Sequence, residues 1–279
     1  MVNTVQQQNE NNASQAFSKQ SIEFDQLYAN DGIIAYKRKR VRDHVLSYLK
    51  SSSNILELNA GTGEDAIFFA GLGHTVHATD ISEGMQQKLR EKTIKAGFIN
   101  SISTERCSFT ELNQLQKKGP YDLIFSNFAG LNCSNELGNI LDSFNGLLKP
   151  GGMVCIVVLS KFCLWEFLLL FRGKLKTATR RLFSSGGKKA HINGIYFTCW
   201  YYSPRFVKKH LKQHYNVEKQ EGLCCIVPPS YIEHFTEKHP RLFAFLRNWE
   251  ERLKGYLPWK NIGDYFIISL KKKEENSPE

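Results

Sequence analysis

The residues best suited to chemistry lie in one short segment, Glu57-Leu-Asn-Ala-Gly-Thr-Gly-Glu-Asp65. Gly61 and Gly63 follow an apolar stretch, and glycine lets a backbone turn approach a ligand closely. The turn runs into a predicted helix, whose first N–H groups attract the polar end of a ligand. Asp80 comes 23 residues after Glu57, at the end of a second apolar stretch, where a carboxylate reaches two ribose hydroxyls. The spacing therefore predicts a site for a cofactor that contains adenosine.

Two kinds of cofactor, dinucleotides and S-adenosylmethionine (SAM), fit a glycine turn followed by such an acid. The dinucleotide fingerprint needs a glycine or alanine three residues after its second glycine, and only Ala66 meets that need here, which makes the match weak. Glu57 favours SAM, because an acid that faces the turn suits the ammonium of a methionine group better than a pyrophosphate.

Three sequence blocks resemble, in order, class I SAM-dependent methyltransferases of the broad type-11 methyltransferase group. They are Leu56-Glu-Leu-Asn-Ala-Gly-Thr-Gly-Glu-Asp-Ala66, Ala78-Thr-Asp-Ile-Ser82 and Leu147-Leu-Lys-Pro-Gly-Gly152. The resemblance covers residues 54–160 and is specific because the three blocks occur together. It implies SAM as the cofactor and methyl transfer as the activity.

The resemblance also implies which residues surround SAM. The methionine end would lie against the turn that contains Glu57, Asn59, Ala60, Gly61 and Gly63. Asp80 would hold the ribose, and the adenine would lie near Ile81, Met85, Ser108 and Phe109. Asn59 stands where the family has the first glycine of the turn. We expect the turn to keep the backbone conformation of the family, because asparagine tolerates left-handed backbone angles better than most residues.

Fewer residues point to the acceptor. Asn127 follows the fourth predicted strand, where it would either contact SAM or the acceptor, or form a turn. The Asn/Asp-Pro-Pro-Tyr/Phe motif of many amino methyltransferases is absent from this segment, which disfavours nucleobases and glutamine as acceptors. A hydroxyl or carbon acceptor needs a base, for which His191 is the first candidate and His210 and Tyr202 are weaker ones. Tyr28 and Tyr36, on a leading helix, would close over SAM.

Alternating strands and helices position these residues. The predicted strands are 54–58, 75–79, 101–106, 121–126, 153–159, 217–227 and 264–270. The predicted helices are 24–49, 64–71, 82–92, 136–148, 203–213 and 228–257. This alternation predicts an α/β fold, a Rossmann-like, doubly wound and mostly parallel seven-stranded sheet with helices on both faces.

The chain divides into a core and two insertions. We expect residues 1–20, which are rich in Gln, Asn and Ser, to be a disordered leader. Residues 21–160 are predicted to form the SAM-binding core with its leading helix, and residues 271–279 a charged tail. Residues 161–202 form a basic, aromatic insertion, and 203–270 complete the core around a second, helical insertion at about 226–262. Both insertions leave from carboxyl ends of strands, so we expect them to form a lid over the transferred methyl group.

The composition adds a charge asymmetry. The net charge is +10, and residues 161–279 carry 22 Lys and Arg against 11 Asp and Glu. Such a field attracts anionic partners, or is simply a solvated surface. Seven cysteines without a C-x-x-C pair or a zinc spacing predict reduced thiols in the cytoplasm and no metal site. The apolar run Phe162–Phe171 is too short to span a bilayer.

The favoured function is methyl transfer from SAM to O or C of a small, largely apolar or aromatic acceptor, anionic and lipid-like ones included. Two alternatives remain open. One is an RNA methyltransferase that uses the basic stretch 161–212. The other is a non-catalytic peripheral membrane protein that contacts a bilayer through 162–171 and the adjacent Arg172, Lys174 and Lys176.

Overall fold

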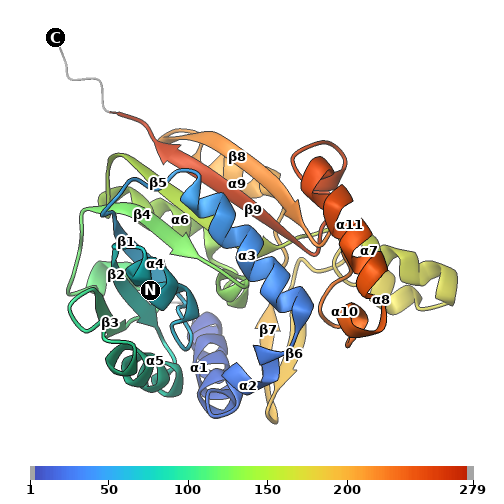
Figure 1. The fold of residues 1–279 in the computed structure, drawn as a ribbon, viewed down its shortest axis with the longest axis horizontal. Helices are drawn as coiled ribbons and strands as arrows, with labels where there is room; N and C mark the ends of the chain where they lie inside the picture. The colour runs from blue at the N-terminus through green and yellow to red at the C-terminus, as the bar shows by residue number, and fades with distance from the viewer. Residues whose placement is uncertain (1–3, 275–279) are drawn as a thin grey trace.

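The computed structural model describes residues 4–274 and contains a seven-stranded sheet between two layers of helices (Figure 1). The strand order is β3-β2-β1-β4-β5-β9-β8. β9 runs antiparallel to β5 and β8, and the other neighbours are parallel. The strands are β1 (Asn54–Leu58), β2 (Thr75–Asp80), β3 (Ile102–Arg106), β4 (Tyr121–Ser126), β5 (Leu148–Leu159), β8 (Tyr215–Leu223) and β9 (Tyr265–Lys272). The predicted mostly parallel, doubly wound sheet is confirmed.

Each face of the sheet is buried by its own helices, because successive side chains of a strand point to opposite faces. Ile55 and Phe125 pack beneath α3 (Gly32–Leu46), α4 (Glu64–Gly71) and α5 (Glu83–Lys95). Leu56 and Ile124 pack on the opposite side, against α6 (Leu137–Ser143) and α9 (Pro204–Leu211). Strands buried on both faces need apolar side chains at every position, which explains the continuous apolar runs in the sequence.

Two predicted helix starts are confirmed by their caps. The Ser82 hydroxyl accepts a hydrogen bond from the Met85 N–H at 3.2 Å, at the start of α5. The Ser203 hydroxyl accepts from the Phe206 N–H at 3.2 Å, and Pro204 is the first residue of α9. Both are standard ways of satisfying the free N–H groups at a helix start.

The predicted helix 24–49 is two helices, α2 (Phe24–Ala29) and α3. The carboxylate of Asp31 accepts the N–H groups of Ile33 and Ile34 at 2.8 and 3.0 Å, so Asp31 caps a new helix. Gly32 lies against Thr236, where an added Cβ would be 2.5 Å from the hydroxyl oxygen. Capping at Asp31 and this close approach explain why the chain changes direction there.

The disordered leader predicted for residues 1–20 is corrected by the structure. Residues 1–3 lie outside the described part, but α1 (Thr4–Gln20) is a helix of 17 residues. It is fixed by polar contacts that hydropathy does not reveal. The amide of Asn9 donates to the carbonyls of Cys133 (2.8 Å) and Thr198 (3.1 Å) and accepts from the Thr198 N–H (2.6 Å).

The insertion 161–202 is more regular than its sequence indicated. It contains α7 (Leu164–Phe167), the 3₁₀ helix η4 (Leu168–Arg172), α8 (Leu175–Thr179) and a hairpin of β6 (Lys188–Ile192) and β7 (Ile195–Cys199). Asn193 and Gly194 form the hairpin turn with φ of 46° and 82°, a typical Asn-Gly signal. β7 lies along α1, where the rings of Phe17 and Phe197 are 5.7 Å apart.

The helical part of the second insertion begins at Phe235, later than the predicted residue 228. It consists of α10 (Phe235–Lys238), α11 (Pro240–Leu253) and the 3₁₀ helix η5 (Trp259–Asn261), where the sequence predicted one helix. The predicted charged tail is partly strand, because β9 continues to Lys272, and residues 275–279 lie outside the described part. Within residues 4–274, no helix combines the length and the apolar character needed to cross a bilayer.

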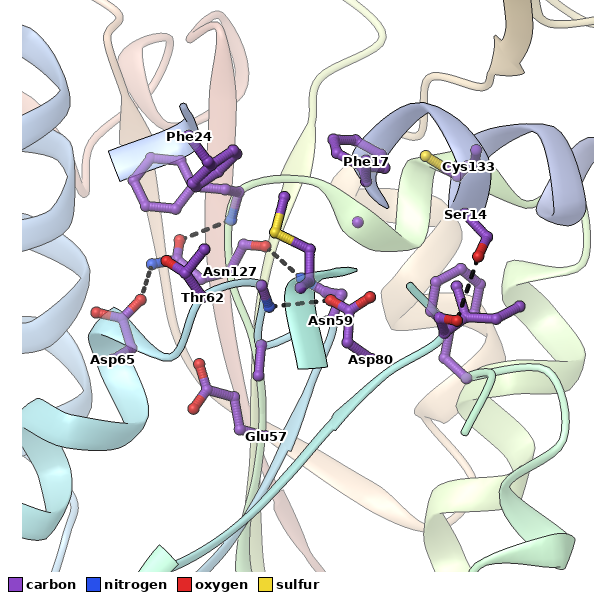
Figure 2. Close-up of a pocket in the computed structure, with 18 of the residues that line it drawn as sticks. Ser14, Phe17, Phe24, Glu57, Asn59, Thr62, Asp65, Asp80, Asn127 and Cys133 are labelled. Carbon is purple, nitrogen blue, oxygen red and sulfur yellow. Dashed lines mark hydrogen bonds between the residues drawn. The ribbon is translucent and has the colours of Figure 1, made fainter. Parts of the chain in front are cut away.

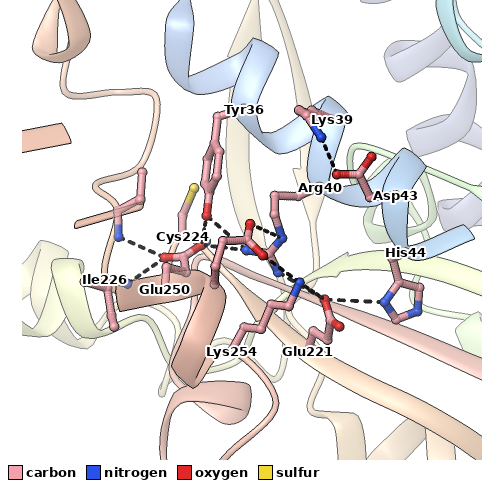
Figure 3. A network of polar contacts seen from close by, with 12 residues as sticks. Tyr36, Lys39, Arg40, Asp43, His44, Glu221, Cys224, Ile226, Glu250 and Lys254 are labelled. Atoms are coloured by element: carbon pink, nitrogen blue, oxygen red, sulfur yellow. Dashed lines mark hydrogen bonds and ion pairs between the residues drawn. The ribbon is translucent and has the colours of Figure 1, made fainter. Parts of the chain in front are cut away.

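A buried polar network joins α11 to α3 and β8 (Figure 3). Arg40 pairs with Glu221 at 3.0 Å, and Tyr36 donates to Glu250 at 3.1 Å. The Glu250 carboxylate also accepts four backbone N–H groups at 2.8–2.9 Å, those of Cys224, Cys225, Ile226 and Val227. A carboxylate that is completely buried is tolerated only when it is satisfied in this way. Glu250 therefore fixes α11 to the core.

Candidate cofactor and acceptor site

A cavity lies at the carboxyl ends of β1, β2 and β4 (Figure 2). This is the edge at which open α/β sheets bind ligands. One wall consists of the turns that follow the three strands. The other wall comes from α1, α2 and α3, which contribute Phe17, Phe24 and Arg38.

The turn after β1 has the backbone that the sequence predicts. Asn59, Gly61 and Gly63 have positive φ values of 46°, 57° and 85°, so asparagine does replace the first glycine without loss of the turn. The Asn59 amide also joins two strands. Its Oδ1 accepts from the Ser126 hydroxyl at 2.6 Å, and its Nδ2 donates to the Asn127 carbonyl at 2.7 Å.

Asp80 ends β2 with its carboxylate held by two backbone donors. Oδ2 accepts from the Gly61 N–H at 2.9 Å, and Oδ1 accepts from the Ser82 N–H at 2.8 Å. Burial raises the pKa of Asp80, and the two N–H donors partly offset that rise. Each oxygen keeps acceptor capacity on the cavity side, as a pair of ribose hydroxyls requires.

Glu57 is the buried acid of the site. It is 3% exposed, lines the cavity, and its Oε2 has no hydrogen-bond partner among the described residues (Figure 2). Burial, and then the neighbouring charge of Asp65, raise the pKa of Glu57 well above its ordinary value. An unpartnered buried carboxylate is costly, and a cationic group of a ligand would satisfy it. The ammonium of SAM fits this requirement.

Asp65 holds the far side of the turn and orders the loop after β4. It accepts from Arg42 at 2.7 Å, from Arg38 at 3.3 Å and from the Asn127 amide at 2.8 Å. Asn127 in turn accepts the Phe128 N–H at 2.8 Å. Phe128 has a φ of 49°, a strained value for an aromatic residue. Asn127 thus lines the cavity and also forms the turn, so both of its predicted roles are compatible with its position.

Helix α1 covers the part of the cavity predicted for adenine. Glu10 accepts from the hydroxyls of Ser108 at 2.8 Å and Thr110 at 2.9 Å. Ser14 donates to the Ile81 carbonyl at 3.2 Å. These contacts place a helix over two of the residues, Ile81 and Ser108, that the sequence predicts around the cofactor.

The structure brings most predicted cofactor residues together. The ten that line the cavity are Glu57, Asn59, Ala60, Gly61, Asp80, Ile81, Met85, Ser108, Phe109 and Asn127. Gly63 lies in the same turn as the N-cap of α4 but does not line the cavity. Tyr28 lines an adjacent groove, and Tyr36 is buried against Glu250, so neither closes over the cavity.

The three predicted bases do not reach the cavity. His191 is exposed on β6 with its ring 4.5 Å from Tyr196, and His210 on α9 has its ring 4.4 Å from Phe206. Tyr202 donates its hydroxyl to the Ser134 carbonyl at 2.5 Å. None of the three is among the described residues that line the cavity, so the geometry gives no support for a base role.

The predicted lid needs a similar correction. Among the described residues that line the cavity, none comes from 161–202 or 226–262. The covering wall comes instead from residues 10–38, and β7 supports it from behind through Phe197. The lining residues that sequence reasoning did not single out are Glu10, Ala13, Ser14, Phe17, Phe24, Arg38, Thr62, Glu64, Asp65, Phe128, Gly130 and Cys133.

A second groove opens beside the first cavity. The two share Phe24, Arg38 and Glu64 as lining residues. Tyr28 and Phe68 add aromatic surface to the outer groove. The shared residues place the outer groove directly beside the cavity.

Comparison with known proteins agrees with this geometry. Residues 55–152 match the family model described as a methyltransferase domain. The chain is 30% identical over 132 residues to a polyketide synthase–nonribosomal peptide synthetase of Pyricularia grisea, a match that covers 43% of this chain and 3% of that protein. It is 25% identical over 135 residues to an uncharacterized methyltransferase of Synechocystis, covering 47% and 60% of the two chains. The match thus spans less than two thirds of either relative.

Among solved structures, the fold is similar to that of 1,6-didemethyltoxoflavin-N1-methyltransferase of Burkholderia thailandensis, which was crystallised with S-adenosylhomocysteine. The TM-score is 0.54, the identity is 14%, and the match covers 94% of this chain and 88% of that one.

Residues 55–152 thus match a methyltransferase domain, and the fold of the chain is similar to that of a SAM-dependent methyltransferase. The buried, unpartnered Glu57 and the two-oxygen acceptor of Asp80 fit SAM as the ligand of this cavity.

Proposed function

We propose that this chain transfers the methyl group of SAM to O or C of a small, largely apolar or aromatic acceptor. This proposal rests on the side chains that line the cavity in addition to those that suit SAM. Besides those residues, the lining includes the apolar Ala13, Phe17, Phe24, Phe128 and Cys133, together with the charged Arg38, Glu64 and Asp65. The apolar members are typical of sites for apolar ligands.

In the cofactor half, Glu57 would pair with the ammonium of SAM, and Asp80 would accept hydrogen bonds from the ribose hydroxyls. Ile81, Met85 and Phe109 offer apolar surface for the adenine. When bound, SAM supplies an electrophilic methyl group on a sulfonium. The chain's own contribution is then alignment of the acceptor and exclusion of water, because an in-line displacement depends chiefly on geometry.

The acceptor must be acidic in its own right. Among the described residues that line the cavity, the titratable ones are five carboxylates, Arg38 and Cys133, with no histidine, lysine or tyrosine. A carboxylate is too weak a base to take a proton from an aliphatic alcohol. We therefore infer a phenol or an activated carbon acid that reacts as its anion. Arg38, which lines both cavities and is paired with Asp65 at 3.3 Å, is the cation nearest to such an acceptor.

An RNA acceptor is the second candidate, and two of the cations in its basic stretch are paired within the fold. Arg181, inside the basic stretch, is buried and bound to Glu166 and Asp264, and Arg180 is bound to Glu166. Two of the charges that RNA would need are thereby committed to the fold.

The proposal is tested by following the label from methyl-tritiated SAM. Purified protein would be offered a set of acidic phenols and 1,3-dicarbonyl compounds, a matched set of aliphatic alcohols, and total RNA. We expect label in the first set. Phe24→Ala should lower kcat/KM for the acceptor at least tenfold, the scale of a lost aromatic contact of about 1.5 kcal/mol. Phe245→Ala, on exposed α11, is the matched control and should have no effect. Label in RNA alone would contradict the proposal.

A further inference from the structure

A small helical knob, residues 164–183 with α7, η4 and α8, projects from the body of the protein near α11 (Figure 1). It presents large apolar side chains to solvent. Phe171 is 83% exposed, Phe183 is 75% exposed and Leu175 is 64% exposed. Single exposed apolar residues are ordinary on a protein surface, but several on one projecting segment mark a site of interaction.

The charge around these side chains has one sign. Arg172, Lys174 and Lys176 are exposed and alternate with the apolar residues along the chain. The sequence contains no Asp or Glu from 167 to 212. The one acid of the knob, Glu166, is buried in its ion pairs with Arg180 and Arg181. The exposed apolar residues of the knob and their neighbouring cations are complementary to a surface that is apolar within and anionic outside. A bilayer with anionic headgroups has that character.

The knob is held in place without these apolar residues. Arg181 is buried, and its guanidinium binds Glu166 at 2.7 Å and Asp264 at 2.5 Å. It also donates to the carbonyl of Ser160 at 3.1 Å, directly after β5. An internal ionic clamp therefore anchors the knob to the core, and Phe171, Leu175 and Phe183 are left free to contact something else.

The knob begins shortly after the carboxyl end of β5. It follows β5, which is parallel to β4, so it begins at the same edge of the sheet that carries the cavity. A surface that contacted the knob would thus lie on the side of the molecule where cofactor and acceptor enter.

We propose that the knob docks the protein on an anionic bilayer, with Phe171, Leu175 and Phe183 in the lipid interface and Arg172, Lys174 and Lys176 on the headgroups. Binding of this kind is peripheral and reversible. It needs neither SAM nor an acceptor, so it can be tested independently of the proposed methyl transfer.

The experiment is sedimentation of the full chain with phosphatidylcholine vesicles that contain or lack phosphatidylserine. We expect binding to the anionic vesicles, at least tenfold weaker without phosphatidylserine, and weakened by salt. Each basic residue near such a surface is worth roughly fivefold in partitioning, so Lys174→Glu/Lys176→Glu should lower it about 25-fold or more. Phe171→Ser/Leu175→Ser should lower it at least tenfold.

The matched control is Ile94→Ser/Ile99→Ser, which removes apolar side chains that are 64% and 63% exposed elsewhere. It should sediment like the unaltered protein. Melting temperature and SAM affinity should be unchanged in all three variants. The proposal is overturned if the unaltered protein does not bind anionic vesicles. It is also overturned if the knob variants bind these vesicles as tightly as the unaltered protein does. Loss of self-association in the knob variants, without vesicle binding, would assign the surface to a second copy instead.

Discussion

The side chain of Asn59 fills the space that any Cβ at position 130 would need. A Cβ on Gly130 would lie 2.3 Å from Asn59 Cγ, far inside contact distance. Asn59 is fixed there by its hydrogen bonds to Ser126 and Asn127. The turn after β1 and the loop after β4 therefore interlock at the cavity, and the asparagine that replaces a glycine in one is matched by a glycine in the other.

This interlock predicts a rescue. Gly130→Ala should displace the turn and weaken SAM binding by about 1–3 kcal/mol, the usual cost of overpacking. Asn59→Gly should remove the clash, so Asn59→Gly/Gly130→Ala should bind SAM more tightly than Gly130→Ala alone. Titration calorimetry of the four proteins in this cycle measures the coupling. Strictly additive effects would show that the contact is unimportant.

Glu57 is expected to lower the stability of the ligand-free protein. Its pKa is raised in the folded state, so the folded protein holds this proton more tightly than the unfolded chain does. The free energy of unfolding must then fall as pH rises through the raised pKa. Glu57→Gln should therefore raise the melting temperature of the free protein above that pKa by a few degrees, since about 1 kcal/mol is worth roughly 2–4 °C in a chain of this size class.

The same substitution should abolish the stabilisation by SAM, because the ammonium loses its partner. Thermal melts across pH, with and without SAM, measure both effects. Glu237→Gln is a control on an exposed ion pair with His234, away from the cavity, and should change neither. A Glu57→Gln protein that is less stable at high pH and still binds SAM would refute this role.

Asn9 should control how long SAM stays bound. It connects α1 to Cys133 and Thr198, and α1 covers the cavity. Asn9→Ala removes bonds worth about 1 kcal/mol each, so SAM should dissociate about tenfold faster and α1 should exchange its amide hydrogens faster. Gln8→Ala, at an exposed neighbour, is the matched control. Unchanged dissociation with faster exchange would mean that α1 does not gate the cavity.

Glu250 should dominate the stability of the C-terminal half. Glu250→Ala would leave four backbone N–H groups and the Tyr36 hydroxyl without their buried acceptor, a loss of about 3 kcal/mol or more. The adjacent Glu251 is 41% exposed in its ion pair with Arg40, so Glu251→Ala should cost less than about 1 kcal/mol. Urea denaturation compares the two, and equal losses would contradict the account.

The strands and helices with a strong sequence pattern were predictable. So were the residues of the site that lie on the turns directly after the strands. All seven strands were predicted, with β1, β4, β5 and β9 marked by apolar runs, whereas β3 and β8 are polar in sequence. The glycine turn with Asp80 predicted the position of the cavity. The carboxyl end of β4 was recognised, but only Asn127 was singled out there, although Phe128 and Gly130 also line the cavity.

The covering wall could not be predicted, because polar contacts build it. α1 is held by Asn9 and Glu10 through hydrogen bonds to loops distant in sequence, and no hydropathy pattern reports such bonds. The hairpin behind it carried a readable signal in Asn193-Gly194. The base candidates do not line the cavity, because no feature of the sequence around His191, Tyr202 or His210 tells which way each side chain faces.

The most direct test of the central claim is a thermal-melt titration with SAM, S-adenosylhomocysteine and NAD, on the unaltered protein and on Asp80→Ala. At a concentration one hundred times its dissociation constant, a ligand adds about 2.7 kcal/mol of stability. We predict a shift with SAM and S-adenosylhomocysteine that is lost in Asp80→Ala, and none with NAD. No shift with SAM, or a shift with NAD alone, would contradict the assignment of the cavity.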